Sequence, residues 1–342
     1  MIREAGHLAR SYSSLSRGRR SRSTASLLAA LGLSCGVPDP APLPPGSFAF
    51  GVFGDGPYRA WEMARFRRVI EDVNRAELQW LLHVGDILWF PCSNEEYADR
   101  LLAINSIRHP VVYTPGDNEW ADCHEAIAGR FQPLDRLRQI RTTFFAHPGT
   151  SLGGQAMPVT PQNQDSGFTD FVENARWQLG GFLFATIHMV GSGNGSEPFE
   201  GRTSADDQEV AARTKAALAW LDEAFRIARS DGLKGVVVAM HGDPGLERDR
   251  EVERGYVALV DRLENLVKAF AGPVLLIHGD SHELIVDHPL LDRSTGEPLA
   301  NFARLETYGS PDIGWVRVVV DSVVGQILAY EPRLMRRRLL WW

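Results

Sequence analysis

The chain has 342 residues, a net charge of -7, a hydrophobic content of 44% and a charged content of 23%. This is the composition of an ordinary globular protein, with enough residues for one large domain or two small ones. The negative charge argues against a basic surface that binds nucleic acid, and no apolar run approaches the roughly 18 residues that a membrane span needs.

The first 46 residues differ from the rest of the chain. Residues 1–22 hold six arginines and one acidic residue, residues 25–33 are mostly apolar, and a proline-rich stretch follows Cys35. A basic region, a short apolar core and small residues are typical of an export signal, which predicts a periplasmic or extracellular protein. In that case Cys35 is a candidate for lipid attachment. The alternative is a disordered basic tail on a cytoplasmic protein.

The proline-rich linker leads to a domain that we predict over residues 47–332, and residues 333–342 form a basic and aromatic tail. Apolar runs and helical spacing predict strands at 48–54, 80–84 and 111–114 and helices at 59–76 and 94–106. Each of these three strands ends in a Gly-Asp pair, which supplies Asp55, Asp86 and Asp117. Because open α/β sheets bind ligands at the carboxyl ends of their strands, the repeated pair predicts one shared site.

The rest of the domain alternates in the same way. The pattern predicts a long loop at 147–180, strands at 182–190, 235–240 and 273–277, helices at 206–230 and 252–271, and antiparallel strands at 283–287, 315–320 and 324–330. His241 follows the strand at 235–240, and Asp280 and His282 follow the strand at 273–277. The fold class predicted from this alternation is α/β.

The residues at the strand ends are chemically unusual as a group. They comprise Asp55, Asp86, Asp117 with Asn118, His241, Asp280 and His282. Packing so many carboxylates together costs roughly several kcal/mol per close pair in a low dielectric, and a bound cation is the usual remedy. A mixed set of oxygen and nitrogen donors suits divalent ions such as Zn, Mn or Fe. The alternative is a series of unrelated turn aspartates and core histidines.

In their order and spacing, these blocks resemble the calcineurin-like metallophosphoesterases, which include the purple acid phosphatases. The resemblance covers roughly residues 48–330 and implies a four-layer αββα sandwich of two mixed sheets between helices. It also implies a dinuclear centre, in which Asp55 and His282 hold one ion, Asp86 bridges, and Asp117, His241 and Asp280 hold the second. Such a centre hydrolyses a small phosphomonoester or phosphodiester through a metal-activated hydroxide.

The sequence departs from the family pattern at several of these positions. Pro57 stands where the first block has histidine, and Trp89 stands where the purple acid phosphatases have a metal-binding tyrosine; Tyr58 could replace it only by an unusual path. Asn118 occupies the place of a proton-donating histidine, and Asp280 replaces another histidine. The first metal shell is therefore poor, and the second favours Mn, Mg or Ca over Zn, although the sequence does not distinguish Mn, Fe, Zn, Mg and Ca.

Further residues are candidates for roles that these departures leave open. The candidate catalytic residues are Asn118, His124 and His188, and the candidate substrate-binding residues from the long loop and beyond are Asn174, Arg176 and Asn194. Each histidine has the alternative of a structural role, and the other three have that of ordinary surface positions. The missing histidines also leave open a second function, a degenerate phosphoesterase-fold protein that binds a ligand or partner without hydrolysis.

Two cysteines remain beyond the N-terminal segment. Cys92 and Cys123 each lie a few residues after a Gly-Asp pair, in loops that we expect on the same edge of the sheet. In an oxidising compartment such a pair predicts a disulfide, and the alternative is two inert thiols.

Overall fold

The computed structural model describes residues 38–88, 90–246 and 252–336. Several parts of the chain lie outside the described residues. They include the predicted export segment, which contains Cys35, as well as Trp89 and residues 337–342. The expectations placed on them stay predictions, as do the predicted domain boundaries.

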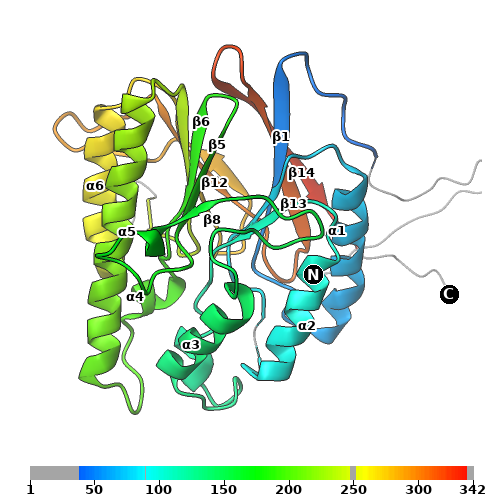
Figure 1. Cartoon of the computed structure of the whole chain (residues 1–342), viewed down its shortest axis with the longest axis vertical. Helices are drawn as coiled ribbons and strands as arrows, with labels where there is room; N and C mark the ends of the chain where they lie inside the picture. The colour runs from blue at the N-terminus through cyan, green and yellow to red at the C-terminus, as the bar shows by residue number, and fades with distance from the viewer. Residues whose placement is uncertain (1–37, 89, 247–251, 337–342) are drawn as a thin grey trace, which may run out of the picture. The chain divides into compact units, whose positions relative to one another are not determined.

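The described strands form two large mixed sheets and one small hairpin (Figure 1). The five-stranded sheet has the order β14-β13-β1-β2-β3, and the seven-stranded sheet has the order β4-β5-β6-β7-β8-β12-β9. The strands of the first sheet are β1 (Ser47–Phe53), β2 (Leu81–His83), β3 (Val111–Tyr113), β13 (Gly314–Asp321) and β14 (Gln326–Leu334). Those of the second are β4 (Thr160–Pro161), β5 (Ala175–Leu179), β6 (Phe182–Thr186), β7 (Gly235–Ala239), β8 (Val274–His278), β9 (Ile285–Asp287) and β12 (Phe302–Glu306). The hairpin pairs β10 (Leu291–Asp292) with β11 (Glu297–Pro298).

Parallel pairing in the centre of both sheets brings the strand ends together. β1, β2 and β3 pair in parallel in the first sheet, and β6, β7, β8 and β12 pair in parallel in the second. The flanking strands β13, β5 and β9 are antiparallel to their neighbours. Because parallel strands end on the same edge, the loops that follow β1, β2, β3, β7 and β8 are positioned for one common site.

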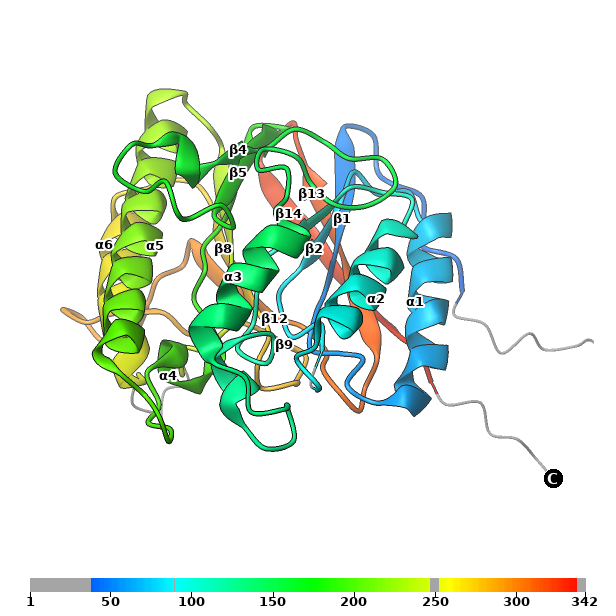
Figure 2. The ribbon, with the colours of Figure 1, turned by 60° about the horizontal axis from the view of Figure 1, so that its bottom comes forward.

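The helices cover the outer faces of the two sheets. They are α1 (Met63–Arg75), α2 (Asn94–Asn105), α3 (Pro133–Phe144), α4 (Gly191–Gly195), α5 (Ser204–Ser230) and α6 (Val257–Lys268), with short 3-10 turns η1 (Ala60–Glu62), η2 (Ala121–His124), η3 (Gln162–Gln164) and η4 (Arg254–Tyr256). Figure 1 and Figure 2 show α5 and α6 on one side of the strands and α1 and α2 on the other. No helix in the described ranges combines the length and the apolar character that a membrane crossing requires.

Three apolar cores separate the resulting four layers. One core joins the first sheet to α1, α2 and α3, a second joins the other sheet to α5 and α6, and the third lies between the sheets. Alternation along β1 shows how one strand serves two cores, because Ala49 and Phe53 face the helices while Phe50 and Val52 face the opposite sheet. Phe50 and Phe184 meet edge to face between the sheets, with ring centroids 5.6 Å apart. The four-layer αββα arrangement is therefore confirmed.

Some local expectations were wrong. Residues 147–180, expected as one long loop, contain β4, η3 and β5, and the strand expected at 182–190 ends at Thr186. Helix α3 and strand β12 were not predicted at all. The apolar residues of α3 that face the core, Leu137, Ile140 and Phe144, are embedded among arginines and threonines, which weakened the helical pattern.

Candidate metal centre

Six polar side chains converge where the parallel strands end. Asp55, Asp86 and Asp117 follow β1, β2 and β3 of the first sheet, and His241, Asp280 and His282 follow β7 and β8 of the second. We call these six residues the strand-end cluster. Asp55, Asp86, Asp280 and His282 have φ values of 52°, 55°, 81° and 70°. Residues other than glycine rarely adopt this left-handed backbone conformation, and those that do are often found at functional sites.

Glycines allow the backbone to approach these carboxylates closely. A Cβ on Gly279 would collide with Asp55 Oδ2, and a Cβ on Gly116 would collide with Asp86 Oδ1. The Gly-Asp pairs therefore do more than turn the chain, because neighbouring glycines leave room for carboxylates that arrive from other strands.

His241 is oriented as a ligand. It is fully buried, and its Nδ1 lies 2.8 Å from the carbonyl oxygen of Val84. Because a carbonyl oxygen can only accept a hydrogen bond, Nδ1 carries the hydrogen. Nε2 consequently faces inward, 2.8 Å from Asp117 Oδ1, 3.3 Å from Asp86 Oδ1 and 3.7 Å from Asp280 Oδ1. A histidine that binds a metal characteristically donates its other N–H to a carbonyl or carboxylate, as this one does.

The ligand atoms fall into two overlapping groups. Atoms of Asp55, Asp86 and His241 lie within 4.8 Å of one another, and so do atoms of Asp117, His241 and Asp280. The second group matches the set expected for the second ion. His282 Nε2 lies 4.0 Å from Asp55 Oδ1, beside the first group, and its Nδ1 lies 2.8 Å from the carbonyl oxygen of Ser310. The donor set fits one or two divalent cations.

Electrostatics favour a cation at this position. Burial raises the pKa of the Asp55 carboxyl to about 8, and it also raises that of Asp280 to about 6. Burial likewise raises the pKa of Asp86, with a further contribution from Asp117, although His241 opposes it. Asp55 Oδ2 is buried without a hydrogen-bond partner. So many carboxylates cannot all be ionised in a buried space unless positive charge is bound among them.

Tyr58 also lies at the cluster, although the sequence suggested only an unusual route for it. Its hydroxyl donates to Asp86 Oδ2 at 2.7 Å and lies 3.2 Å from His282 Nε2. Burial and the carboxylates of Asp86 and Asp55 raise the pKa of this phenol well above its usual value. The signal that could have located it is the Gly-Pro turn between Asp55 and Tyr58, which folds the chain back toward the strand end.

The loops that carry Asp86 and Asp117 are tied together by hydrogen bonds. Asn118 donates to Asp86 twice, from its backbone N–H at 3.1 Å and from Nδ2 at 2.5 Å. The buried Glu119 accepts from the N–H of Ile87 at 2.7 Å and from the hydroxyl of Tyr113 at 3.0 Å. Asn118 thus contacts the cluster, and it orients a carboxylate.

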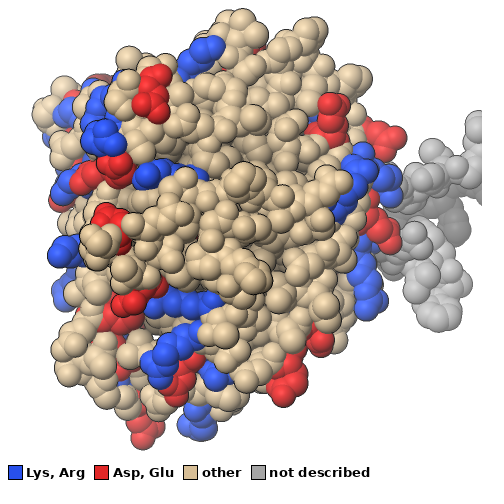
Figure 3. Space-filling view, viewed as in Figure 1, with Lys and Arg blue, Asp and Glu red and all other residues tan. Residues whose placement is uncertain are grey.

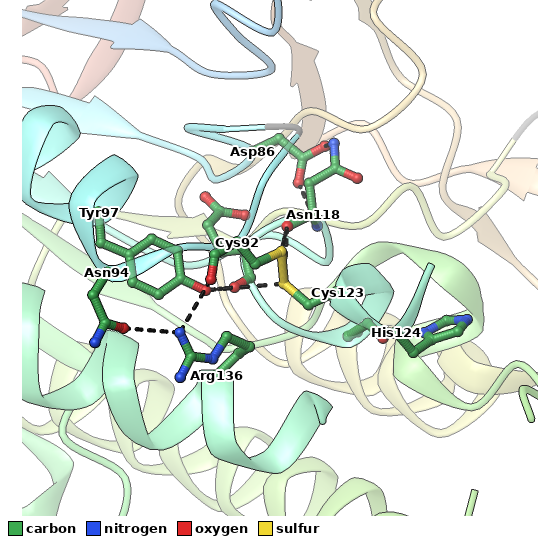
Figure 4. Close-up of a disulfide and its surroundings, with 10 residues drawn as sticks. Asp86, Cys92, Asn94, Tyr97, Asn118, Cys123, His124 and Arg136 are labelled. Carbon is green, nitrogen blue, oxygen red and sulfur yellow. Dashed lines mark hydrogen bonds between the residues drawn. A yellow bond between two sulfur atoms is a disulfide. The ribbon is translucent and has the colours of Figure 1, made fainter. Parts of the chain in front are cut away.

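A disulfide reinforces the same connection (Figure 4). Cys92 and Cys123 are bonded, and both are fully buried. Their sulfur atoms lie 3.4 and 3.6 Å from the carbonyl oxygen of Asn118. The bond therefore holds the loop after Asp86 against the loop after Asp117.

His124 and His188 are not brought to the cluster. Figure 4 shows His124 directed away from Asp86 and Asn118, and its ring stacks on Phe199 with centroids 4.3 Å apart. His188 is buried, with its Nδ1 2.8 Å from Glu173 Oε1. Of the histidines in the described ranges, His241 and His282 are those within 4.0 Å of a cluster carboxylate. A catalytic role for His124 and His188 therefore rests on the sequence alone.

A small pocket adjoins the cluster on the His124 side. It has a volume of about 190 Å³ and is lined by residues that include Asp122, His124, Ser192, Phe199 and Arg202. The Ser192 hydroxyl lies 3.1 Å from Asp117 Oδ2 and 2.9 Å from Asp122 Oδ2, so it separates the pocket from the cluster. The sequence pattern assigned no role to Ser192 or Asp122, because neither belongs to a Gly-Asp pair.

The three candidate substrate-binding residues contact the scaffold. Asn174 donates to Gln162 Oε1 at 2.6 Å and accepts from the N–H of His188 at 2.7 Å. The guanidinium of Arg176 lies 4.1 Å from the ring centre of Trp220, and the buried Asn194 donates to Thr214 at 2.9 Å. Through these contacts the three residues stabilise β5, α5 and the turn after β6. Their role in substrate binding stays a prediction.

In Figure 3 lysines and arginines are interspersed with acidic residues, without a broad basic area on that face.

Comparisons with known proteins support the fold. No protein-family model matches the sequence, and no curated protein matches it. The solved structure titled "Structure of PhoD" is similar with a TM-score of 0.51 and 13% identity over 84% of this chain, which spans 65% of that chain. GAP50 of Plasmodium has a TM-score of 0.45 at 10% identity, covering 85% of this chain and 90% of that one. A phosphatase from Mycoplasma pneumoniae has a TM-score of 0.43 at 12% identity, covering 84% and 93%. Of these three, the PhoD structure has a TM-score above 0.5, and at 13% identity its similarity concerns the fold alone.

Proposed function

We propose that this protein is a metal-dependent phosphoesterase that hydrolyses a small phosphomonoester or phosphodiester. The observation that carries the proposal is the orientation of His241. Its Nδ1 is committed to a carbonyl oxygen, and its Nε2 faces three carboxylates at 2.8, 3.3 and 3.7 Å. A neutral imidazole would direct its lone pair at three anionic groups, so the arrangement requires positive charge at this point, which either a proton on Nε2 or a bound cation supplies.

In this proposal the residues divide between two neighbouring ions. Asp55 and His282 would hold the first ion, Asp117, His241 and Asp280 would hold the second, and Asp86 would be available to either. Bound divalent ions lower the pKa of water and stabilise the charge that develops on a phosphoryl group. The chain itself orients the ligands, since Val84 and Ser310 fix the two imidazoles and Asn118 fixes the Asp86 carboxylate.

The residue at the position where the leaving group's proton donor is expected cannot act as an acid. Asn118 stands where an acid is expected, and its amide is engaged with Asp86. Because proton donation matters least when the leaving group is already acidic, we expect faster turnover of aryl esters than of alkyl esters. The same observation favours the rival function, a degenerate phosphoesterase-fold protein that binds a ligand or partner without hydrolysis.

Metal analysis combined with turnover separates these two functions. The protein is stripped with a chelator and reloaded with Mn, Zn, Mg or Ca, and the bound metal is counted. Hydrolysis of p-nitrophenyl phosphate and bis-p-nitrophenyl phosphate is then followed for each metal. His241→Ala should lose both metal and turnover, whereas His147→Ala, which replaces an exposed histidine, should lose neither. An absence of turnover, with or without bound metal, would support the rival function and refute the phosphoesterase.

We also propose that the protein is exported. The buried disulfide supports this proposal, since such bonds persist in oxidising compartments. Cell fractionation that finds the full-length chain in the cytoplasm with free thiols at Cys92 and Cys123 would contradict it.

A further inference from the structure

We infer that the Tyr58 phenolate is a ligand of the first ion, in place of the histidine that Pro57 replaces. This inference rests on the proposed function, because it assumes that the strand-end cluster binds metal. Tyr58 is buried, and its hydroxyl lies between Asp86 Oδ2 at 2.7 Å and His282 Nε2 at 3.2 Å.

The spacing of these atoms is that of ligands around one ion. With metal–ligand distances of roughly 2.1 Å, adjacent ligands lie about 3.0 Å apart in an octahedral shell and about 3.4 Å apart in a tetrahedral one. The distances here are 2.7 Å from Tyr58 to Asp86, 3.2 Å from Tyr58 to His282 and 4.0 Å from His282 to Asp55. The two distances from Tyr58 bracket both values, whereas the third exceeds them, so His282 and Asp55 would have to move closer together to enclose an ion with Tyr58 and Asp86.

A ring of hydrogen bonds holds Tyr58 and His282 as one unit. The backbone N–H of Tyr58 donates to Glu62 Oε2 at 2.8 Å, and the Ser310 hydroxyl donates to Glu62 Oε1 at 2.7 Å. The carbonyl of Ser310 accepts from His282 Nδ1 at 2.8 Å, and the N–H of Ser310 donates to the carbonyl of Asp55, also at 2.8 Å. Partners of this kind orient metal ligands, and here they orient the tyrosine together with the histidine and the aspartate.

The hydrogen-bond donors and acceptors of Tyr58, His282 and Asp86 also favour a metal ion at this point. Since His282 Nδ1 is the donor to Ser310, its Nε2 carries a lone pair and can only accept. The hydroxyl of Tyr58 has one proton and lies between His282 Nε2 and Asp86 Oδ2, so it can donate to one of them at a time. An ion bound at this point interacts with all three atoms at once, and the phenol proton leaves to the solvent as the ion binds.

Spectroscopy of metal binding tests the inference without reference to activity. Metal-free full-length protein is titrated with Mn or Zn near neutral pH, the bound metal is counted, and the ultraviolet difference spectrum is recorded for phenolate formation. The wild type should form a single phenolate as metal binds. Tyr58→Phe should lose that signal and bind one ion at least tenfold more weakly, whereas Tyr330→Phe, a matched change on β14, should behave like the wild type.

The outcomes are distinguishable. Metal bound without a phenolate would show that Tyr58 acts only as a hydrogen-bond donor, and it would overturn this inference while leaving the proposed function intact. A signal that survives in Tyr58→Phe would also overturn it. Failure to bind any metal would refute the proposed function as well. Because the wild-type spectrum carries the result, the test holds even if the variant folds poorly.

Discussion

Replacing Asp55 with asparagine should have opposite effects on stability in the presence and absence of metal. Asp55 is fully buried; its Oδ1 accepts from the N–H of Asp280 at 2.8 Å, and its Oδ2 has no partner. Its carboxylate lies within 4.8 Å of that of Asp86. At this distance two unit charges would repel by roughly 3 kcal/mol at an effective dielectric constant of about 20. Because burial raises the pKa of Asp55 to about 8, the wild type avoids this repulsion near pH 7 by taking up a proton when it folds.

Asparagine retains the size of the side chain and the acceptor for Asp280, and it removes the charge. Because the variant neither ionises nor has to take up a proton at this position, and because His241 already offsets part of that cost, we expect metal-free Asp55→Asn to be more stable than the wild type by about 1–3 kcal/mol. This corresponds to a rise in melting temperature of roughly 2–4 °C per kcal/mol. In excess Mn the order should reverse, since an ion at 1,000 times its dissociation constant stabilises the wild type by about 4 kcal/mol and the variant by less.

Thermal unfolding with chelator and with Mn measures both effects. Asp99→Asn, an exposed change on α2, is the matched control and should stay within about 0.5 kcal/mol of the wild type in both conditions. A variant that melts below the wild type in chelator would refute the idea that charge repulsion strains the cluster. If Mn stabilises Asp55→Asn as much as it stabilises the wild type, Asp55 is not a metal ligand.

Three further changes test other parts of the structure. Burial alone would raise the pKa of Glu173, but Arg141 and His188 lower it from 4.5 to about 2. Glu173→Gln should therefore lower the free energy of unfolding by about 3 kcal/mol above pH 4.5. Urea unfolding at pH 3 should show a smaller difference, because the wild type loses the stability that ionised Glu173 contributes as the pH falls toward 2. Gly279→Ala should displace Asp55 and reduce the metal content measured by elemental analysis, whereas Gly167→Ala, whose added Cβ would have its nearest neighbour at 3.4 Å, should not. Replacing Cys92 and Cys123 together by alanine opens a loop with a sequence separation of 31 and should cost about 3–4 kcal/mol in urea unfolding, and a loss below about 1 kcal/mol would mean that the bond constrains little.

Much of the cluster was predictable because its signals are local. Each ligand lies a few residues after a short apolar run, and burial of that run requires a strand whatever the rest of the chain does. Gly54, Gly85, Gly116 and Gly279 mark the turns where those strands end. The sequence therefore indicated which residues would meet, and the parallel pairing of the strands brings them together.

The misread residues depend on partners far along the chain. Glu173 pairs with Arg141 and His188, and nothing near any of the three reveals the others. Polar residues such as Asn174 and Arg176, in a stretch rich in glycine and asparagine, resemble a solvated loop, whereas the structure places Asn174 in a buried network beside β5. Tyr58 was underestimated for the same reason, because its closeness to His282 arises only when both sheets are assembled.

The strand order also determines when and where the site can form. β1, which precedes Asp55, is flanked by β2 and by β13 at Gly314–Asp321, so its sheet is incomplete until that distant segment has joined. His241, Asp280 and His282 come from the other sheet, and contacts of such long sequence separation form slowly. If the chain is exported before it folds, the cluster assembles at the destination. The ions available in that compartment, rather than those of the cytoplasm, would then decide which metal the protein carries.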